Sequence, residues 1–256
     1  MKRIAIAMQK GGTGKTTTTI NLAGALAQMG QKVLVIDLDP QANLTRSFGV
    51  MPETHPDILT TYDILIGNDQ QVADAIIDTG YGIDLIPSDG RLSDAEQRLP
   101  QAINYYFKLD RKLKEITDYD FILLDCRPTL GPITLNAFAA ADEVLAVLNC
   151  EDFAVQGLGD FLTLFDNVKR ELNPRVKLVG VLLTQYSNQS EHKRVVSEVQ
   201  SVLGNTVLKT IIGRRAVLTS NSRMGPVQFY SPSSASAIEY RELASELIER
   251  IGNYAT

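Results

Sequence analysis

Two lysines and three glycines fall within six residues near the N-terminus, in the sequence Lys10-Gly-Gly-Thr-Gly-Lys15, and Thr16 follows directly. Glycines allow backbone N–H groups to converge on an anion, and a helix that begins at such a loop adds the positive end of its dipole. In this arrangement Lys15 would reach the β- and γ-phosphates of a nucleotide, and the Thr16 hydroxyl would bind Mg²⁺. The spacing therefore predicts a phosphate-binding loop for a nucleoside triphosphate.

The loop departs from the standard pattern G-x-x-x-x-G-K-[ST], because the first glycine of that pattern falls on Gln9. No G-x-G-x-x-G can be written here, which disfavours a dinucleotide site. Lys10 is an additional cation at the mouth of the loop, where it is badly placed for its own γ-phosphate and well placed to stabilise transition-state charge in a facing subunit. We expect catalytic roles for Lys10 and Lys15. The predicted nucleotide contacts are Lys10, Gly11, Gly12, Thr13, Gly14, Lys15, Thr16 and Thr17.

Acidic residues follow two of the predicted strands. The strand Val33–Ile36 leads into Asp37-Leu-Asp39, and the strand Phe121–Leu124 leads into Asp125. Parallel strands present their carboxyl ends at one edge of the sheet, where such folds bind ligands, so we expect these carboxylates beside the phosphate loop. Asp39 would orient the attacking water or hold Mg²⁺ through water, and Asp125 would take the usual strand-end Mg²⁺ role. The candidate metal residues are therefore Thr16, Asp39 and Asp125, and Asp39 is also a candidate catalytic residue.

Apolar runs elsewhere in the chain indicate the elements that must position these residues. Most runs are continuous rather than alternating, which is typical of strands covered on both faces. Helical patterns lie between them, so we predict a doubly wound, mostly parallel α/β sheet of about seven or eight strands with helices on both faces, as in P-loop NTPases. We expect one domain over residues 1–256, helices over 158–172 and 235–251, and a surface loop over Gly49–Asp57. The predicted strands are Ile4–Met8, Val33–Ile36, Ile83–Ile86, Phe121–Leu124, Val144–Leu148, Leu178–Leu183 and Val207–Ile212.

Composition excludes some classes of protein. The chain of 256 residues is 44% hydrophobic, which excludes intrinsic disorder. Its apolar runs are far shorter than the ~20 residues of a membrane span. Two cysteines, Cys126 and Cys150, make neither a disulfide framework nor a zinc site, and a cytoplasmic protein is expected.

The net charge of −5 hides an asymmetry, since residues 165–230 carry ten Lys and Arg against four Asp and Glu. That basic third predicts an anion-binding face on an acidic body.

The motifs together resemble those of ParA/Soj-type partition ATPases, and the resemblance covers essentially the whole chain. The phosphate loop is similar to the deviant Walker A loop of this family, and Asp37-Leu-Asp-Pro-Gln-Ala-Asn is similar to its second motif. Further matching stretches are Thr61-Tyr-Asp-Ile-Leu-Ile-Gly, Leu85-Ile-Pro-Ser, Leu123-Leu-Asp-Cys, Thr134-Leu-Asn-Ala, Ala141-Asp-Glu-Val and Cys150-Glu-Asp-Phe-Ala-Val-Gln-Gly-Leu.

The resemblance implies a Mg²⁺-dependent ATPase that forms an ATP-sandwich homodimer. Lys10 would reach across to the partner's phosphates, Asp39 would position the hydrolytic water, and Arg214 would lie near the adenine. Members of the family bind double-stranded DNA without sequence preference as ATP dimers, are stimulated by a cargo-bound partner of the ParB type, and partition plasmids or chromosomes. The resemblance thus implies a protein that associates with the nucleoid in its ATP state and with no membrane. It also places the chain with the small form that has no N-terminal helix-turn-helix domain.

Two departures from the family pattern bear on the predicted function. Arg127 replaces the first proline of the usual Asp-Cys-Pro-Pro after the Walker B strand. Val217 stands where relatives carry an arginine that serves DNA binding, and an upstream family arginine is also replaced. Other cations in the basic third could substitute for them. The candidate DNA-binding residues are Lys193, Arg194, Arg215 and Arg223.

Alternative functions remain at this point. A MinD-like ATPase that cycles on a membrane surface shares the nucleotide motifs, but it needs a basic amphipathic C-terminal helix, and this chain has one Arg against two Glu after Ser245. An iron–sulfur reductase would use Cys126 and Cys150, which we interpret instead as buried, unreactive thiols. A metabolic P-loop ligase or kinase would need an acceptor pocket that nothing in the sequence supplies.

His55 and His192 lie in polar surroundings, and we expect both to be exposed. The aromatic run Tyr105-Tyr106-Phe107 predicts helix packing in the core or at a dimer contact.

Overall fold

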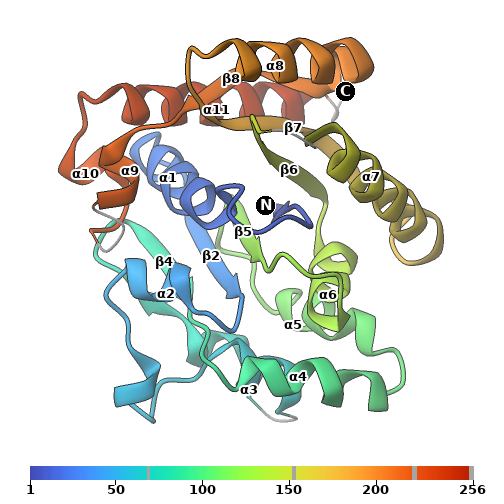
Figure 1. The fold of residues 1–256 in the computed structure, drawn as a ribbon. Helices are drawn as coiled ribbons and strands as arrows, with labels where there is room; N and C mark the ends of the chain where they lie inside the picture. The colour runs from blue at the N-terminus through green and yellow to red at the C-terminus, as the bar shows by residue number, and fades with distance from the viewer. Residues whose placement is uncertain (68–69, 152–153, 221–223, 254–256) are drawn as a thin grey trace.

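The computed structural model describes residues 1–67, 70–151, 154–220 and 224–253, and these form one eight-stranded sheet between two layers of helices (Figure 1). The strand order is β3-β4-β2-β5-β1-β6-β7-β8. All neighbouring strands are parallel except β3, which pairs antiparallel with β4. The strands are β1 (Lys2–Ala7), β2 (Val33–Leu38), β3 (Ile77–Asp78), β4 (Ile83–Ile86), β5 (Phe121–Cys126), β6 (Glu143–Asn149), β7 (Lys177–Tyr186) and β8 (Val207–Gly213). The predicted doubly wound α/β sheet is confirmed.

The helices divide between the two faces of the sheet. The core on one face contains apolar residues of α3 to α8, and the core on the other face contains those of α1, α2, α10 and α11. Figure 1 shows α1 and α11 lying close to one another on the second face, and the two helices are in contact. The helices are α1 (Lys15–Gln28), α2 (Asn43–Ser47), α3 (Thr61–Ile66), α4 (Leu92–Arg98), α5 (Lys108–Leu113), α6 (Pro132–Ala140), α7 (Ala154–Glu171), α8 (Ser190–Leu203), α9 (Ala216–Ser220), α10 (Val227–Tyr230) and α11 (Ala235–Asn253).

The continuous apolar runs of the central strands are explained by this double cover. In β5, Ile122 and Leu124 join the core beneath α3 to α8, while Phe121 and Leu123 join the core beneath α1 and α11. Successive side chains of a strand point to opposite faces, so every residue of such a strand is buried. The same alternation places Asp125 on the face covered by α1, because it follows Leu123 by two residues.

Several predicted bounds differ from the structure. Strand β7 extends through Tyr186 and strand β5 through Cys126, beyond their apolar runs. Strand β3 has only two residues, which is too short to leave an apolar pattern in the sequence. Tyr105–Phe107 form a 3₁₀ turn rather than part of an α-helix, and the rings of Tyr105 and Tyr106 stack with centroids 3.8 Å apart. The expected loop after Gly49 contains a single short 3₁₀ turn, Pro52–Thr54.

No helix within the described part of the chain is both long enough and apolar enough to cross a bilayer.

Candidate functional site

The predicted phosphate loop, residues 8–14, joins β1 to α1 at the carboxyl edge of the sheet. Its backbone uses glycine where another residue would be strained, since Gly12 and Gly14 have φ angles of 72° and 92°. Only glycine adopts such positive values at little cost. Helix α1 begins at Lys15 immediately after Gly14, so the N–H groups of its first turn face the concavity of the loop. The local geometry therefore fits an anion.

Two residues at the end of β7 donate hydrogen bonds to the backbone of this loop. Thr184 Oγ1 donates to the Thr13 carbonyl over 2.6 Å, and Gln185 Nε2 donates to the Gly12 carbonyl over 2.5 Å. Gln185 itself has a φ of 55°, a conformation that is uncommon for a residue with a side chain. Neither Thr184 nor Gln185 was predicted from the sequence. Their position directly after a predicted strand, at the edge where ligands bind, was the available signal.

Lys15 is buried within the loop, whereas Lys10 is exposed at its mouth. Lys15 is 7% exposed, and its Nζ donates to the Lys10 carbonyl over 3.2 Å. Burial lowers the pKa of Lys15, and the charges of Asp125 and Asp39 oppose that change. The Lys10 side chain is 44% exposed, and its Nζ lies 3.2 Å from Glu151 Oε2. The two lysines thus occupy different environments, one inside the loop and one facing outward.

Asp125 lies at the end of β5, beside the first turns of α1. Its Oδ1 accepts a hydrogen bond from Thr19 Oγ1 over 3.1 Å. Within the part of the chain that the structure describes, its buried Oδ2 has no hydrogen-bond partner. Burial raises the pKa of Asp125 to about 8, the charge of Asp37 adds to this effect, and contacts with Thr16, Thr19 and Lys15 oppose it. A buried carboxylate oxygen without a donor, next to a threonine hydroxyl, is a donor set that suits Mg²⁺.

Asp37 and Asp39 have separate environments although they are two residues apart. Asp37 is fully buried on β2, in register with Asp125 on β5. Its Oδ2 accepts bonds from Thr45 Oγ1 (2.7 Å) and Thr45 N (2.9 Å), and its Oδ1 accepts one from Asp39 N (3.1 Å). Burial raises the pKa of Asp37 to about 6, against these hydrogen bonds. Asp37 therefore anchors the segment that follows β2, and Asp39 is the half-buried carboxylate at the edge of the site.

Two cavities flank the N-terminus of α1. One of about 450 Å³ is lined by Thr16, Thr17, Arg46 and seven further residues, most of them on α1, α2 and α10. A smaller one of about 150 Å³ lies between Gly14, Thr184, Gln185 and the segment 212–219. Arg214, the residue expected near the adenine, lines this smaller cavity. The structure thus brings Arg214 to the phosphate loop from about 200 residues along the chain.

The candidate DNA-binding residues lie on two elements. Lys193 and Arg194 are exposed on α8, and Arg215 follows β8. Arg215 is held by Glu239 of α11, with 2.8 Å between Nη1 and Oε1, so its charge is partly neutralised. Arg223 lies outside the described residues. Val217 is half-buried, and its carbonyl accepts a hydrogen bond from the Tyr230 hydroxyl over 3.0 Å.

One expectation about histidine was wrong. His55 is exposed as predicted, but His192 is only 7% exposed. Its Nδ1 accepts a hydrogen bond from Ser187 N over 2.9 Å, which closes the turn between β7 and α8. Polar neighbours in sequence suggested a surface position, whereas the ring satisfies a backbone donor within the fold.

Both cysteines are buried, at 2% exposed for Cys126 and 0% for Cys150. Burial raises the pKa of the Cys126 thiol well above its usual range and that of Cys150 to about 11. Two protonated, inaccessible thiols do not resemble cluster ligands, because metals bind thiolates.

Comparison with known proteins places this site in a family. Residues 1–178 match the family described as an AAA domain. The chain is 38% identical to the chromosome partitioning protein ParA of Caulobacter vibrioides, over 98% of this chain and 95% of that protein. It is also 38% identical to the sporulation initiation inhibitor protein Soj of Bacillus subtilis, over 96% of this chain and 98% of that protein.

A solved structure of similar shape carries the expected ligands. The structure of cobyrinic acid a,c-diamide synthase from Mycobacterium smegmatis with bound ADP and magnesium has a TM-score of 0.87 and 34% identity, and the match covers 98% of this chain and 96% of that one. A second structure of the same protein contains an ATP analogue and magnesium, with a TM-score of 0.86. With its glycine loop, buried lysine and strand-end aspartates, the present chain belongs to the ParA/Soj family of P-loop ATPases, which bind ATP and Mg²⁺ and hydrolyse ATP.

Proposed function

We propose that this protein is a partition ATPase that forms a homodimer around two ATP molecules, binds double-stranded DNA without sequence preference, and is stimulated by a ParB-like adaptor. Its cargo would be a plasmid, a chromosome or another assembly. The relatives named for chromosome partitioning support this role. We expect the protein in the cytoplasm, associated with the nucleoid when ATP is bound.

The position of Lys10 carries the proposal. Its ammonium group is exposed at the mouth of the loop and contacts Glu151, which is itself half-exposed. The buried Lys15 already supplies a cation to the loop's own phosphate site. A second, outward lysine is suited to the phosphates of a facing subunit, where a cation delivered in trans stabilises transition-state charge. ATP would then hold the dimer together, and hydrolysis would release it.

The residues of the site divide the chemistry of hydrolysis among them. Backbone N–H groups of the loop and Lys15 would bind the phosphates. Thr16 and Asp125 would hold Mg²⁺, which supplies charge neutralisation at the phosphate oxygens. Asp39, at the edge of the site, would orient the attacking water. Asp37 would hold the segment 39–45 through Thr45, so that Asp39 stays in reach of the phosphates.

Cations of the basic segment 165–230 support the proposed DNA binding. The exposed cations Lys193 and Arg194 lie on α8, and the half-buried Arg215 lies in the turn after β8. These elements belong to the part of the sequence, residues 165–230, that has ten basic against four acidic residues. Phosphate contacts of this kind give binding without sequence preference.

The C-terminal helix does not favour the membrane alternative. Tyr240, Leu243 and Leu247 of α11 are at most 1% exposed in the core against α1 and the sheet, whereas Ile238 and Ile248 of the same helix are 43% and 37% exposed. An amphipathic helix that binds a bilayer needs its apolar face free for lipid. The described part of α11 uses that face for packing.

The test is retention of the purified protein on double-stranded DNA with ADP, with ATP, and with ATP after a Lys10→Ala change, at two salt concentrations. We expect retention with ATP alone, its loss in the variant, and weaker retention at high salt. Light scattering on the same samples reports the dimer. Lys32→Ala, which removes an exposed lysine near the opposite edge of the sheet, is the control and should be retained like the wild type.

Dimerisation with ATP but no DNA retention at either salt concentration would contradict the proposed DNA binding. The dimer would then have to bind another surface, such as a membrane or a protein assembly. Retention that is the same with ADP and ATP would contradict the nucleotide switch. ATP-dependent binding to anionic lipid vesicles instead of DNA would support the membrane alternative.

A further inference from the structure

Arg127 occupies a position where related ATPases commonly carry proline, and the structure shows what its side chain contacts. Its Nη1 donates to Glu96 Oε1 over 2.9 Å. Both side chains are largely buried, with exposed fractions of 20% and 21%. Glu96 belongs to α4, on the face of the sheet opposite α1. The guanidinium is therefore directed to the α4 layer rather than to the cavities at the start of α1.

Glu96 contacts both ends of the segment 127–131, which follows Asp125 and leads into α6. A Cβ atom on Gly131 would lie only 2.1 Å from Glu96 Oε2, so the carboxylate packs directly on the backbone of Gly131. Within the segment, the Thr129 carbonyl accepts a hydrogen bond from Thr134 Oγ1 of α6 over 2.7 Å. One carboxylate thus fixes the start and the end of the loop after the Walker B strand.

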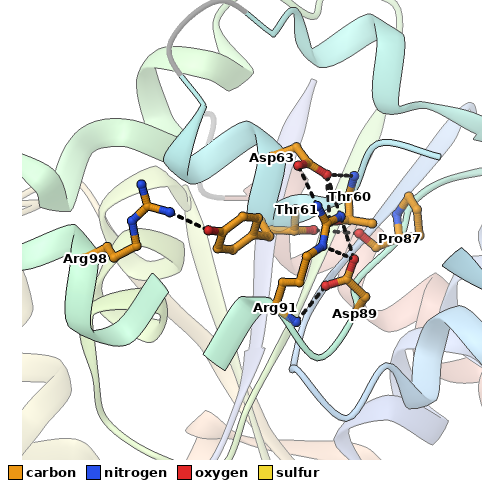
Figure 2. A network of polar contacts seen from close by, with 8 residues as sticks. Thr60, Thr61, Asp63, Pro87, Asp89, Arg91 and Arg98 are labelled. Carbon is orange, nitrogen blue, oxygen red and sulfur yellow. Dashed lines mark hydrogen bonds and ion pairs between the residues drawn. The ribbon is translucent and has the colours of Figure 1, made fainter. Parts of the chain in front are cut away.

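Helix α4 is itself held by a second ion-pair network at its N-terminus, shown in Figure 2. Arg91 makes two hydrogen bonds to the Asp63 carboxylate of α3, over 3.1 and 2.9 Å. The same guanidinium contacts Asp89 Oδ2 from Nε and Nη2, over 2.9 and 2.7 Å. Paired contacts of this kind fix orientation as well as distance. They tie α4 to α3 and to the loop after β4.

From α3 the contacts return to the phosphate site. The Thr61 hydroxyl lies 2.8 Å from the Asp37 carbonyl and 3.1 Å from the Pro87 carbonyl. Figure 2 shows Thr61 and Pro87 beside the arginine network. Polar contacts, joined to one another by the backbones of α4 and α3, therefore connect Arg127, two residues after Asp125, to Asp37. The two ends of this connection lie at the strand ends that carry the acidic residues of the site.

We infer that Arg127 and Glu96 form a positioning pair for ATP hydrolysis. The ion pair holds segment 127–131, and with it the Asp125 end of β5, against α4. A proline at position 127 would restrict this backbone by fixing φ, and here a side-chain contact supplies that restriction. The inference rests on the proposed roles of Asp39 and Asp125 in hydrolysis. Misplacement of reacting groups by an ångström is enough to lower a rate substantially.

The pair is not arranged for maximal stability. Among the described residues, no hydrogen-bond acceptor meets the buried Nε of Arg127. A buried donor without an acceptor is costly, and largely buried ion pairs contribute little net stability compared with apolar contacts. A positional role explains the pair better than a stabilising one.

The experiment compares kcat and KM for ATP in the wild type, Arg127→Ala, Glu96→Ala, the double variant and Arg127→Pro. Each alanine variant should lower kcat about tenfold, which corresponds to one 1.4 kcal/mol step in the barrier, with KM changed less than about threefold. The double variant should lose no more than either single variant, because both remove one interaction. Arg127→Pro should keep the wild-type kcat, and adding Glu96→Ala to it should change nothing. Cys126 is the last residue of an extended strand, which is the conformation that a following proline favours.

A second variant perturbs the pair without touching either partner. Gly131 has φ −146° and ψ −177°, an extended conformation that alanine also adopts. The methyl group of Gly131→Ala would displace the Glu96 carboxylate. It should lower kcat in the wild-type background and leave kcat unchanged in Arg127→Pro.

The matched control is Glu246→Ala, which breaks the ion pair of Glu246 and Arg250 at a similar burial, 12% and 20% exposed. It should lower Tm and leave kcat unchanged. A wild-type kcat in Arg127→Ala, or additive losses in the double variant, would overturn the inference. So would a decrease in kcat that only matches the unfolded fraction seen by circular dichroism. A wild-type protein that binds a fluorescent ATP analogue but does not hydrolyse ATP would contradict the proposed catalytic roles instead.

Discussion

Asp37 and Asp39 show how two identical residues acquire different roles from their hydrogen bonds. Asp37 accepts three bonds, from the hydroxyl and amide of Thr45 and from the amide of Asp39. These hydrogen bonds use its carboxylate to fix the segment that follows β2. Asp39 accepts the Gln41 amide through Oδ1 over 3.0 Å and remains half-buried at the edge of the site. Water has access to Asp39 and none to Asp37.

Asp39→Asn should therefore lower kcat about 10²-fold or more while changing the affinity for ATP only slightly, because general-base and water-orienting groups act in the transition state. Single-turnover hydrolysis and binding of a fluorescent ATP analogue measure the two quantities. Asp37→Ala is the contrasting variant. It leaves two donors of Thr45 without an acceptor and should lower the free energy of unfolding by about 1–3 kcal/mol. Hydrolysis at the wild-type rate in Asp39→Asn would contradict the assignment.

The two thiols should be unreactive in the native protein. Burial raises the pKa of Cys150 to about 11 and that of Cys126 further, so both are protonated at pH 8, and the thiolate is the reactive form. A thiol-reactive chromogenic disulfide at pH 8 should label neither cysteine within minutes and both in denaturant. Rapid labelling of one thiol in the folded protein would show that its strand end opens.

Single residues also mark the limit of what the sequence predicts. The glycines, Lys15 and the strand-end aspartates follow from spacing, because the loop and the strand ends are local. The contact of Arg127 with Glu96 joins positions 31 residues apart, and nothing local specifies it. The prediction that His192 is exposed was wrong for the same reason, because its hydrogen-bond partner is the Ser187 amide in a turn that only the folded chain forms.

At the scale of elements, every described strand except β3 was predicted, the edge strand β8 included. Apolar runs that are covered on both faces predict their strands directly, as Val33–Ile36 does for β2 and Phe121–Leu124 does for β5. Strand β3 was missed, because two residues paired at the edge produce no periodicity. Strand order could not be predicted either, since it depends on which helices pack on which face.

Helix α1 packs closely against α10, and a glycine makes the approach possible. A Cβ on Gly24 would lie 2.3 Å from Pro226 Cβ, an atom of a rigid ring. Gly24→Ala should therefore lower the free energy of unfolding by about 1–3 kcal/mol, as overpacking does, despite the better helix propensity of alanine. Chemical denaturation measures this.

Gly159→Ala is the matched control, because Gly159 lies in α7, is exposed, and has nothing within 4 Å of an added Cβ. It should stabilise the protein by about 0.5–1 kcal/mol. Stabilisation by both substitutions would mean that α10 is free to move away from α1.

For the whole molecule, the uneven distribution of charge matters more than its total. The net charge is −5, yet residues 165–230 are basic and contribute α8 and the turn after β8. An acidic protein with one basic segment can orient itself on an anionic polymer without binding it indiscriminately elsewhere. Which cations contribute depends on their local partners, and these differ along the segment.

The salt dependence of DNA binding measures these contributions. Each phosphate contact adds roughly −0.9 to the slope of log K against log salt, so Lys193→Ala/Arg194→Ala should reduce the magnitude of the slope by about 1.8 in the ATP state. Arg215→Ala should change it less than Lys193→Ala, because Glu239 already holds the Arg215 guanidinium at 2.8 Å, whereas the acidic partner of Arg194, Glu198, lies at 3.4 Å. Fluorescence anisotropy with mixed-sequence duplex DNA at several salt concentrations gives the slopes. An unchanged slope in the double variant would place the DNA contacts away from α8. A larger effect of Arg215→Ala would show that Glu239 releases this arginine when DNA binds, so that its charge is available only in the complex.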